Sequence, residues 1–389
     1  MRDLQIGVIG AGGRGGLARH VEEVDANCRL VGAADINQDT LEVFRKRHGK
    51  DTFITTDHRA LLERKDVDAI FVCSPDHFHE EHAVAALEAG KSVYLEKPIA
   101  VTIEGADKIL GTAMKTGSKL YLGHNMRYFP SILKMKELID DGVIGEVQAV
   151  WCRHFVAIGG DAYFKDWHSE RTNSTGLLLQ KGAHDIDVIH WLSSAYTNSV
   201  VAMGKLSVYN NANRRNERDE WDKKLDVNNW PPLAAKDYAK HIDVEDHNMV
   251  LMQLDNGIQA SYLQCHYTPD YWRNYTFIGT EGRIENEGDA GDCFIHVHKT
   301  RTHTNGKPSQ TIQLKPISGS HGGSDPAIVK AFVEFIRNGT TPNTSPVAAR
   351  YAVAAGVMAT DSLRNGSSLR SVPALDPEVR AYFDRGQKK

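Results

Sequence analysis

The sequence has no long apolar run and no segment typical of a signal peptide. Its uncharged apolar runs, such as residues 6–11 and 69–73, are about six to eight residues long, whereas about 20 are needed to cross a bilayer. The amino-terminal residues read directly as a strand, with neither a basic region nor a cleavage site ahead of it. We therefore expect no membrane partner.

Cysteine is scarce and unpaired in pattern. The five cysteines lie far apart, at Cys28, Cys73, Cys152, Cys265 and Cys293, with no C-x-x-C spacing. This excludes a disulfide scaffold and predicts free thiols in the cytoplasm.

Neither sign of charge dominates. The 46 basic and 50 acidic residues give a net charge of −4, which provides no electrostatic footprint for nucleic acid. With 389 residues, 41% of them hydrophobic and 25% charged, the chain has the composition of a globular protein of two or three domains.

Residues 1–122 alternate short apolar runs with amphipathic stretches. The expected strands are residues 4–9, 29–34, 69–73, 92–95 and 119–122, and the expected helices are 17–24, 39–48, 79–89 and 103–116. This alternation predicts that residues 1–122 form an α/β domain of the Rossmann type, with a doubly wound parallel sheet.

After about residue 145 the chain becomes rich in β-type segments. The expected strands are 147–155, 200–209, 249–254, 258–266, 275–279, 283–286 and 294–297, and the expected helices are 175–192, 326–338 and 346–365. We expect residues 123–389 to form an α+β domain with an open, mostly antiparallel sheet, whose carboxy-terminal helices pack back on the first domain. The polar segment 210–241 reads as a long loop, a lid or a contact arm.

A glycine-rich turn follows the first expected strand. Residues 10–15 read GAGGRG, a G-x-G-x-x-G pattern, and Asp35 ends the second strand 20 residues after Gly15. Such glycines allow a tight turn and close approach of a pyrophosphate, and the acidic residue accepts hydrogen bonds from the adenosine ribose. The pattern favours NAD, and Arg14 leaves NADP use open.

Two further loops follow strands of the same sheet. Histidines at 77, 79 and 82 suggest either a metal cluster or a loop beside the dinucleotide, and we favour the loop, with no metal. Lys97, between Glu96 and a proline, is placed to hold a substrate hydroxyl. Residues 125, 127 and 128 follow another strand and either contact nicotinamide or substrate or are structural.

Two segments of the second half carry candidate substrate groups. Lys181 and His184 share a helix face, and His184 has a pKa suited to general acid–base catalysis, although a core histidine is the plainer alternative. Asp187 either orients a ring nitrogen or caps a network. Residues 151–175 combine aromatic side chains with donors that suit a sugar, and with basic groups that suit an anionic substituent, although a solvated loop fits equally well.

In order, residues 10–15, 74–75, 96–98, 123–128 and 181–187 resemble motifs of the glucose–fructose oxidoreductase/inositol dehydrogenase (Gfo/Idh/MocA) family. The resemblance implies NAD as cofactor, a catalytic lysine at Lys97, a catalytic histidine at His184, and a homo-oligomer, dimer or tetramer, formed through the carboxy-terminal sheet. Gln180 stands where the family's dehydrogenases usually have aspartate.

These arguments give three sets of candidate residues. The catalytic candidates are Lys97, His184, Lys181 and Tyr128. The cofactor-binding candidates are Gly10, Gly12, Gly13, Arg14, Gly15, Asp35, Ser74, Pro75, His79, Glu96, Lys97 and Asn125. The substrate-binding candidates are Arg127, Tyr128, Arg153, Lys165, Trp167, His168, Arg171, Asn173 and Lys181.

We expect an NAD-dependent enzyme that acts on a small-molecule sugar or glycoside. The departure at Gln180 and the presence of Lys181 favour redox-assisted glycoside hydrolysis, as in the sulfoquinovosidase-like members that the chain resembles. The alternatives are a simple NAD-dependent sugar or polyol dehydrogenase and a non-catalytic dinucleotide sensor. Lys97 and His184 argue against the sensor, which would not need them.

Overall fold

A computed structural model describes residues 3–216, 225–289, 292–315, 317 and 320–388. The chain divides into two compact units. Unit 1 comprises residues 1–128, 319–350 and 375–389, and unit 2 comprises residues 129–318 and 351–374. The sequence placed the boundary at residues 122 and 123, whereas the chain leaves the first unit after Tyr128 and returns to it twice. Each unit is described by itself.

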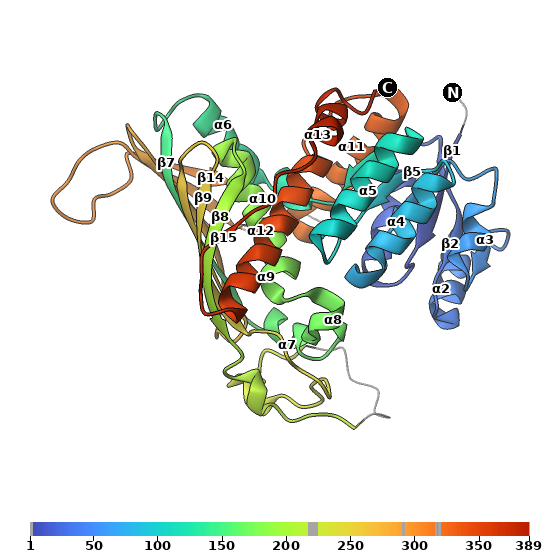
Figure 1. Ribbon diagram of the computed structural model, residues 1–389, viewed down its shortest axis with the longest axis horizontal. Coiled ribbons are helices and arrows are strands. Elements are labelled where there is room, and N and C mark those ends of the chain that lie inside the picture. Colours follow the sequence, from blue (N-terminus) through green and yellow to red (C-terminus); the bar gives the residue numbers. More distant parts are fainter. Residues whose placement is uncertain (1–2, 217–224, 290–291, 316, 318–319, 389) are drawn as a thin grey trace. The chain divides into compact units, whose positions relative to one another are not determined.

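Unit 1 is built on a six-stranded parallel sheet (Figure 1). Its order is β3 (Phe53–Thr55), β2 (Cys28–Ala34), β1 (Leu4–Ile9), β4 (Ala69–Val72), β5 (Ser92–Leu95) and β6 (Leu120–Leu122). The central strands are almost wholly buried and apolar, as strands covered by helices on both faces must be. The direction of strand succession reverses between β1 and β4, and ligands of such sheets bind at the carboxyl ends beside that reversal.

Helices of unit 1 connect the strands and include two that come from the end of the chain. They are η1 (Gly13–Arg19), α1 (His20–Val24), α2 (Gln38–His48), α3 (His58–Leu62), η2 (Asp76–Phe78), α4 (His79–Glu88), α5 (Ile103–Thr116), η3 (Asn125–Tyr128), η7 (Ser320–Gly323), α11 (Ser324–Asn338) and α13 (Pro377–Asp384). The Phe332 ring of α11 packs edge-on against Phe71 and Tyr94 of the sheet, at centroid distances of 5.1 and 5.5 Å. This apolar contact attaches α11 to the amino-terminal sheet.

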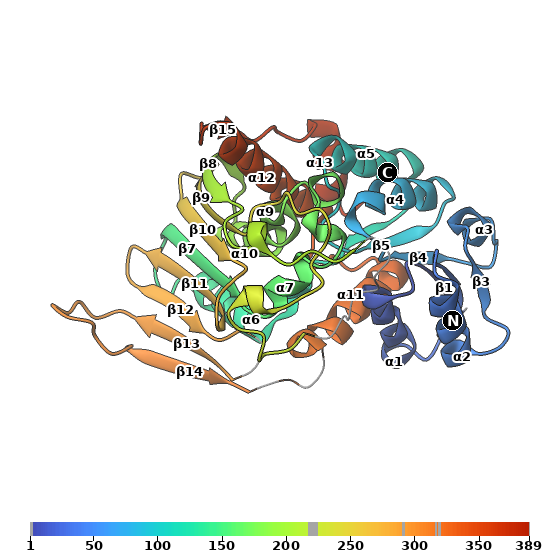
Figure 2. The same ribbon diagram turned by 90° about the horizontal axis from the view of Figure 1, so that it is seen from below.

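Unit 2 is built on a nine-stranded mixed sheet, whose strand order can be followed in Figure 2. The order is β14 (Gln310–Leu314), β13 (Cys293–His298), β12 (Arg283–Glu287), β11 (Tyr271–Gly279), β7 (Val147–Val156), β10 (Gln259–Cys265), β9 (His247–Leu254), β8 (Thr197–Lys205) and β15 (Arg370–Ser371). Among the described strands of this nine-stranded sheet, only β7 and β10 pair in parallel. The predicted fold class, a Rossmann sheet followed by an α+β unit with a mostly antiparallel sheet, is confirmed.

One face of the unit 2 sheet is covered and the other is exposed. Along β9 buried residues alternate with exposed ones, the pattern of a sheet with one solvated face. The helices of this unit are α6 (Pro130–Asp140), α7 (Gly159–Tyr163), η4 (Trp167–Ser169), α8 (Arg171–Ser174), α9 (Leu177–Gln180), α10 (Gly182–Ser193), η5 (Tyr209–Asn211), η6 (Pro232–Ala234) and most of α12 (Pro346–Arg364).

Several elements differ from the sequence-based expectation, and the helix expected over residues 175–192 and two of the strands illustrate why. The single helix expected over residues 175–192 is two helices, α9 and α10, which meet at Lys181. The short strand β3 and the exposed strand β14 were not predicted, because neither carries a long apolar run. Part of the expected loop, residues 217–224, lies outside the described residues. No helix in the described part of the chain has both the length and the apolar character that a membrane span requires.

Candidate functional site

The glycine loop of unit 1 is shaped by two close backbone approaches. A Cβ on Gly15 would lie 2.0 Å from the carbonyl oxygen of Gly10, and a Cβ on Gly10 would lie 2.6 Å from the amide nitrogen of Ser74. Gly10 also has a φ of +83°, which only glycine adopts freely. Gly12 and Gly13 are exposed, and a Cβ on Gly13 would meet no atom within 4 Å. The loop therefore has the compact backbone and open upper surface that a pyrophosphate requires.

Asp35 stands at the end of β2 beside this loop. Its carboxylate accepts a hydrogen bond of 2.9 Å from the Asn37 amide and one of 3.3 Å from the Gly12 amide. Asp35 also lines a cavity of about 140 Å³ whose other walls are mostly apolar and include Ile36 and Pro75. An apolar slot with one carboxylate at its edge suits an adenosine, with the base in the slot and the ribose hydroxyls on the acid.

Arg14 is held by two carboxylates of its own unit. Its guanidinium lies 2.8 Å from Glu96 and 3.1 Å from Asp325, which also accepts a 3.2 Å hydrogen bond from Asn125. Burial by itself would lower the pKa of Arg14, but the two acids outweigh burial and raise it. These contacts occupy the group that the sequence left open for a 2′-phosphate, so they favour NAD over NADP.

Histidines of the loop after β4 serve the protein's own backbone. The Nδ1 of His79 lies 2.6 Å from the Pro98 carbonyl, and its Nε2 lies 2.8 Å from the Ser74 carbonyl. His82 contacts the Ser74 hydroxyl at 2.9 Å. His79 thus ties the ends of β4 and β5 together. Within the described ranges, no group of three or more His, Cys, Asp or Glu side chains is arranged to hold a metal.

The remaining unit 1 candidates follow β5 and β6. Lys97 is partly exposed just beyond the end of β5, where its amide donates to the Glu96 carboxylate. Arg127 is buried and donates to the Asn343 carbonyl, while the Tyr128 hydroxyl lies 2.9 Å from that of Tyr121. Burial raises the pKa of Tyr128, so its hydroxyl stays protonated near neutral pH and is unsuited to act as a base. Of these three candidates, Lys97 is a partly exposed lysine at the carboxyl end of the sheet.

In unit 2, Lys181 and His184 lie at the start of α10. Lys181 occupies the junction between α9 and α10, and its Nζ lies 5.7 Å from the centre of the Tyr163 ring. The next residue, Gly182, has little room for a side chain, since a Cβ there would lie 3.1 Å from Tyr262. His184 is partly exposed one turn further. The helix start thus packs against the sheet, and the Lys181 and His184 side chains beside it are only partly exposed.

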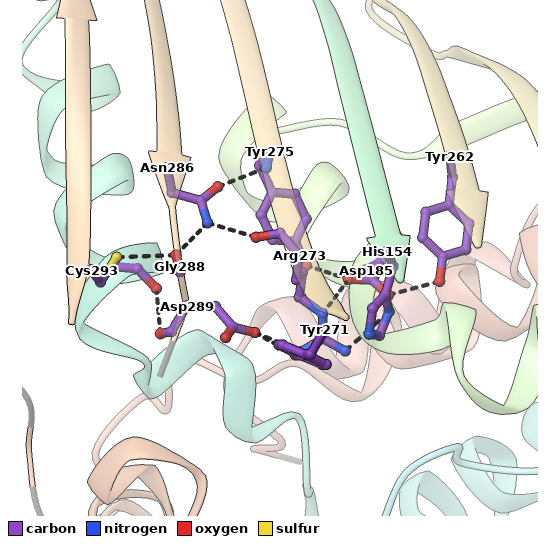
Figure 3. Close-up of polar contacts among 11 residues, drawn as sticks. His154, Asp185, Tyr262, Tyr271, Arg273, Tyr275, Asn286, Gly288, Asp289 and Cys293 are labelled. Carbon is purple, nitrogen blue, oxygen red and sulfur yellow. Dashed lines mark hydrogen bonds and ion pairs between the residues drawn. The ribbon is translucent and has the colours of Figure 1, made fainter. Parts of the chain in front are cut away.

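Figure 3 shows a buried polar network of unit 2, whose charged members Arg273, Asp185 and Asp289 act electrostatically on Lys181. At its centre is Asp185, which is 0% exposed and accepts hydrogen bonds from the hydroxyls of Tyr262, at 2.8 Å, and Tyr275. His154 Nδ1 lies 3.0 Å from the Asp185 carboxylate, and Arg273 Nε lies 3.2 Å from it. A buried carboxylate with four such partners is compensated for its loss of water.

The network continues from Arg273 to a second acid. Arg273 lies 3.4 Å from Asp289, which also accepts a 2.7 Å hydrogen bond from the Tyr271 hydroxyl. The buried guanidinium of Arg273, on β11, therefore bridges Asp185 and Asp289 (Figure 3).

The charges of this network shift the titration of its members. Burial and the Arg273 guanidinium lower the pKa of Lys181 to about 8 and that of His154 to about 3. Burial by itself would raise the pKa of Asp185, but Arg273 outweighs burial and holds it below its usual range. Near neutral pH the network therefore contains an ionised acid, a neutral histidine and a lysine that gives up its proton readily.

The predicted substrate segment is only partly assembled around Lys181. His168 stacks on Trp167 at 3.7 Å and meets the Tyr163 ring at 4.9 Å, the same ring that Lys181 contacts. Asn173 donates to the Trp167 carbonyl at 3.4 Å. These residues form one aromatic and polar cluster.

The basic residues of that segment are dispersed. Arg153 is exposed on β7, whereas its neighbour His154 is buried on the other face. Arg171 is bound to the Asp243 carbonyl and lies 3.3 Å from Glu245. Lys165 is buried 5.6 Å from the Tyr238 ring. They do not converge on one anion site within unit 2.

Sequence reasoning missed the acids and the arginine that organise each unit. Asp325 lies 311 residues from Arg14, and Arg273 lies 119 residues from His154. Asp185 sits next to His184 in a helix with few charged residues, and this buried helix-start acid was the one local signal available.

Comparison with known proteins identifies the family. Residues 4–124 match the NAD-binding Rossmann fold of the Gfo/Idh/MocA oxidoreductase family, and residues 136–371 match its C-terminal alpha/beta domain. The chain belongs to this family, which confirms the resemblance seen in the sequence and the assignment of NAD as cofactor.

Individual relatives are more distant. The Bacillus subtilis protein YteT is 27% identical over 304 residues, or 68% of this chain and 71% of that protein. An inositol 2-dehydrogenase of Klebsiella pneumoniae is 36% identical over 191 residues, or 49% of this chain, and the match spans 54% of that enzyme. A levoglucosan dehydrogenase in complex with NADH and levoglucosan shares the fold, with a TM-score of 0.77 and 19% identity over 96% of this chain and 100% of that one.

Proposed function

We propose that this protein is an NAD-dependent dehydrogenase that transfers hydride between the cofactor and a hydroxyl-bearing carbon of a cyclic polyol or sugar. The observation that carries the proposal is the position of Lys97. This residue follows β5, and the glycine turn follows β1 of the same parallel sheet, so both lie at the carboxyl ends of its strands. The inositol and levoglucosan dehydrogenases among the similar proteins act on ring polyols, which supports this substrate class.

The residues of unit 1 fit the cofactor. The Gly10–Gly15 backbone would hold the pyrophosphate, Asp35 the adenosine ribose and the slot beside Pro75 the adenine. NAD, when bound, accepts or returns the hydride. Everything else in the reaction is positioning and proton transfer by the chain's own side chains.

The proton of the reacting hydroxyl needs an acceptor. We assign this role to His184 and assign to Lys97 the holding of the hydroxyl oxygen, because an ammonium donates to that oxygen and stabilises charge as the proton departs. In the reverse direction the protonated His184 returns this proton, and Tyr128, whose pKa is raised, would stay protonated and serve as a hydrogen-bond donor to the substrate.

The test is a substrate screen read by NADH formation. The purified chain is mixed with NAD and, in turn, myo-inositol, levoglucosan and common pyranoses. Stoichiometric NADH with at least one ring polyol, and weak or no reaction with NADP, is the expected result. Failure of the whole panel to reduce NAD would remove the dehydrogenase proposal.

Redox-assisted glycoside hydrolysis remains the second candidate, and Lys181 is the observation that favours it. Oxidation of a ring hydroxyl to a ketone makes the C–H bond of the neighbouring carbon acidic. A base removes the proton of that bond, a carbon–carbon double bond forms, and the anomeric substituent leaves with the electron pair of its bond to the anomeric carbon. Water then adds to the double bond, and the hydride returns from NADH to the ketone. The elimination needs a base in addition to His184, and a lysine with a pKa of about 8 is suited to it.

Deuterium labelling separates the two candidates. Incubation of an aryl glycoside with enzyme and NAD in D₂O should, for the hydrolase, release phenol only when NAD is present and place deuterium beside the anomeric carbon. NADH accumulation with an intact glycosidic bond would decide for the dehydrogenase. A sulfoquinovoside in the same assay tests the anionic substrate that the sequence suggested, for which the dispersed arginines of unit 2 give little support.

We also propose a homo-oligomer formed through the exposed face of the unit 2 sheet. Met203 of β8 pairs with Met249 of β9, and both side chains are exposed, as are Leu251 and Trp151 on the same face. A contiguous apolar patch of this kind marks a protein interface.

Light scattering after size exclusion checks this interface. The wild type should have the mass of a dimer or tetramer, and a Met249→Lys, Leu251→Lys variant should have that of one chain. Leu133→Lys, at an exposed position of α6, is the matched control and should leave the mass unchanged. A monomeric wild type would contradict the interface.

The cysteines support the cytoplasmic location that we propose. All five are free thiols in the structure. Burial raises the pKa of Cys73 and Cys152 and so keeps them protonated and unreactive, which suits a reducing compartment.

A further inference from the structure

A second cavity of unit 2 has no role in the reaction described above. It has a volume of about 260 Å³, near the lower end of the range of roughly 300–1,000 Å³ that small-molecule sites occupy. Its size suits one ring and not a longer chain. The lining residues that matter here are Asp161, Asp226, Asn229, Trp230, Tyr267 and Tyr271.

The lining combines aromatic faces with hydrogen-bonding groups. Trp230 and Tyr271 are both 49% exposed, so their rings are open to a ligand. Large aromatic rings left open to solvent in a cavity offer stacking surfaces for the apolar face of a sugar, while carboxylate and amide groups bind its hydroxyls. This pairing of groups is characteristic of carbohydrate recognition.

Asp161 lines the cavity and is oriented by hydrogen bonds to one of its carboxylate oxygens. Its Oδ1 accepts hydrogen bonds from the hydroxyls of Tyr209, at 2.6 Å, and Tyr238, at 3.1 Å. None of the described residues donates to Oδ2. The carboxylate is thus fixed in orientation by one oxygen while the other can accept a hydrogen bond from a ligand hydroxyl.

The charge of the lining selects among sugars. Two aspartates line the cavity, and none of the described lining residues is a lysine or an arginine. Lys165 acts on Asp161 electrostatically but is not part of the wall. A uronate or sulfonate placed here would meet like charge, so the lining favours a neutral ring.

The cavity adjoins the buried network through two elements. On α7, Asp161 lines the cavity while Tyr163 contacts Lys181. On β11, Tyr271 lines the cavity and donates its hydroxyl to Asp289 of the network. A ligand in the cavity would therefore lie close to Lys181, which is one of the substrate-binding candidates.

We propose that this cavity is an accessory sugar subsite that binds a second, uncharged ring of a disaccharide or glycoside, with Trp230 as its stacking surface. The proposal rests on the proposed function, since it extends a sugar substrate from one ring to two. It assigns to the chain a preference for substrates larger than a monosaccharide.

The test is calorimetric binding to the full-length chain saturated with NADH, so that no oxidation occurs. The probes are cellobiose, lactose and maltose, their component monosaccharides, and cellobiouronic acid. At least one neutral disaccharide should bind tenfold or more tightly than its monosaccharides. Trp230→Ala should reduce that advantage to twofold or less, with an unchanged unfolding temperature and unchanged monosaccharide affinity.

Two controls make the result specific. Leu233→Ala removes a side chain that is 41% exposed and near Trp230 in the sequence but lies outside the cavity, and should leave the disaccharide advantage intact. Asp226→Asn removes one negative charge of the lining and should reduce the difference in binding affinity between cellobiose and cellobiouronic acid.

Several outcomes would overturn the subsite. These are the absence of any disaccharide advantage, its survival in Trp230→Ala, or tighter binding of the uronic acid. Oxidation of monosaccharides with no disaccharide advantage would reject the subsite and leave the proposed function standing. Disaccharide binding in the absence of NADH formation by any sugar would do the reverse.

Discussion

The two units build their polar sites in opposite ways. In unit 1 the glycine turn is contiguous in sequence and works through backbone shape, with side chains such as Asp35 added at strand ends. In unit 2 the network joins side chains spread from His154 to Asp289, and works through buried charge. A site formed by close backbone approaches is disrupted when a substitution adds a side-chain atom, whereas a buried charge network is destabilised when a substitution removes one of its charged partners.

The largest effect should come from the proposed catalytic pair. Lys97→Ala and His184→Ala should each lower turnover by roughly 10²–10⁴-fold, because each removes a group that holds or moves the hydroxyl proton. Both should leave the NAD affinity nearly unchanged when it is measured by calorimetry. Lys136→Ala, on the surface of α6, is the control for removing a lysine. Wild-type turnover in either variant would show that its role is misassigned.

The buried acid of unit 2 comes next. Asp185→Asn removes one of the two negative charges that balance Arg273, and should lower the free energy of unfolding by about 3–5 kcal/mol, because the buried guanidinium then keeps only the more distant Asp289 as a counter-charge. Urea unfolding measures the loss. Asp384→Asn, which breaks an exposed pair with Arg380, should cost less than about 1 kcal/mol. Equal losses in the two variants would mean that the network is not a unit.

The glycine turn should respond to added volume. Gly15→Ala forces a Cβ to within 2.0 Å of the Gly10 carbonyl, and should cost about 1–3 kcal/mol of stability and weaken NAD binding at least tenfold. Gly111→Ala, inside α5, meets no atom within 4 Å and should stabilise the chain slightly. NAD affinity that is unchanged by Gly15→Ala would place the pyrophosphate elsewhere.

The smallest effect concerns Lys181 and pH. Its pKa of about 8 lies below the ordinary value of 10.5, so between these pH values the unfolded chain binds more protons and stability rises with pH. Lys181→Met removes the cost of burying the charge, and should be more stable than wild type by about 1 kcal/mol at pH 7, after allowance for partial solvent screening. The difference should shrink as the pH rises through this window. Lys330→Met, at an exposed site, should show no such trend.

The sequence predicted most of unit 1 correctly because its signals are local. Strand β1, strand β5 and helix α5 have the predicted bounds, since apolar runs and a Thr102 cap with Gly117 at the other end define them within a few residues. The α9–α10 break was missed, and the close approach of Gly182 to Tyr262 at this point is a contact across 80 positions that no local pattern records.

The candidate residues divide along the same line. The glycine turn, Asp35 and Lys97 were found from motifs, and Lys181 from helix spacing. The grouping of Lys165 and Arg171 into one anion site was inferred from closeness in sequence, and the structure gives these two residues separate partners. Closeness along the chain predicts a shared surface only where one regular element carries both side chains.

The sequence by itself determined the Rossmann sheet, the NAD-type glycine turn and the family, because each depends on short motifs and on strand and helix patterns that are local in the chain. Only the tertiary structure decided the partners of Arg14, the environment of Lys181 and the aromatic cavity around Trp230. These depend on Asp325, Arg273 and Tyr271, which reach their partners from elsewhere in the chain. Charge and stacking act over a few ångströms in space, and no local pattern records which distant side chain will arrive within that distance.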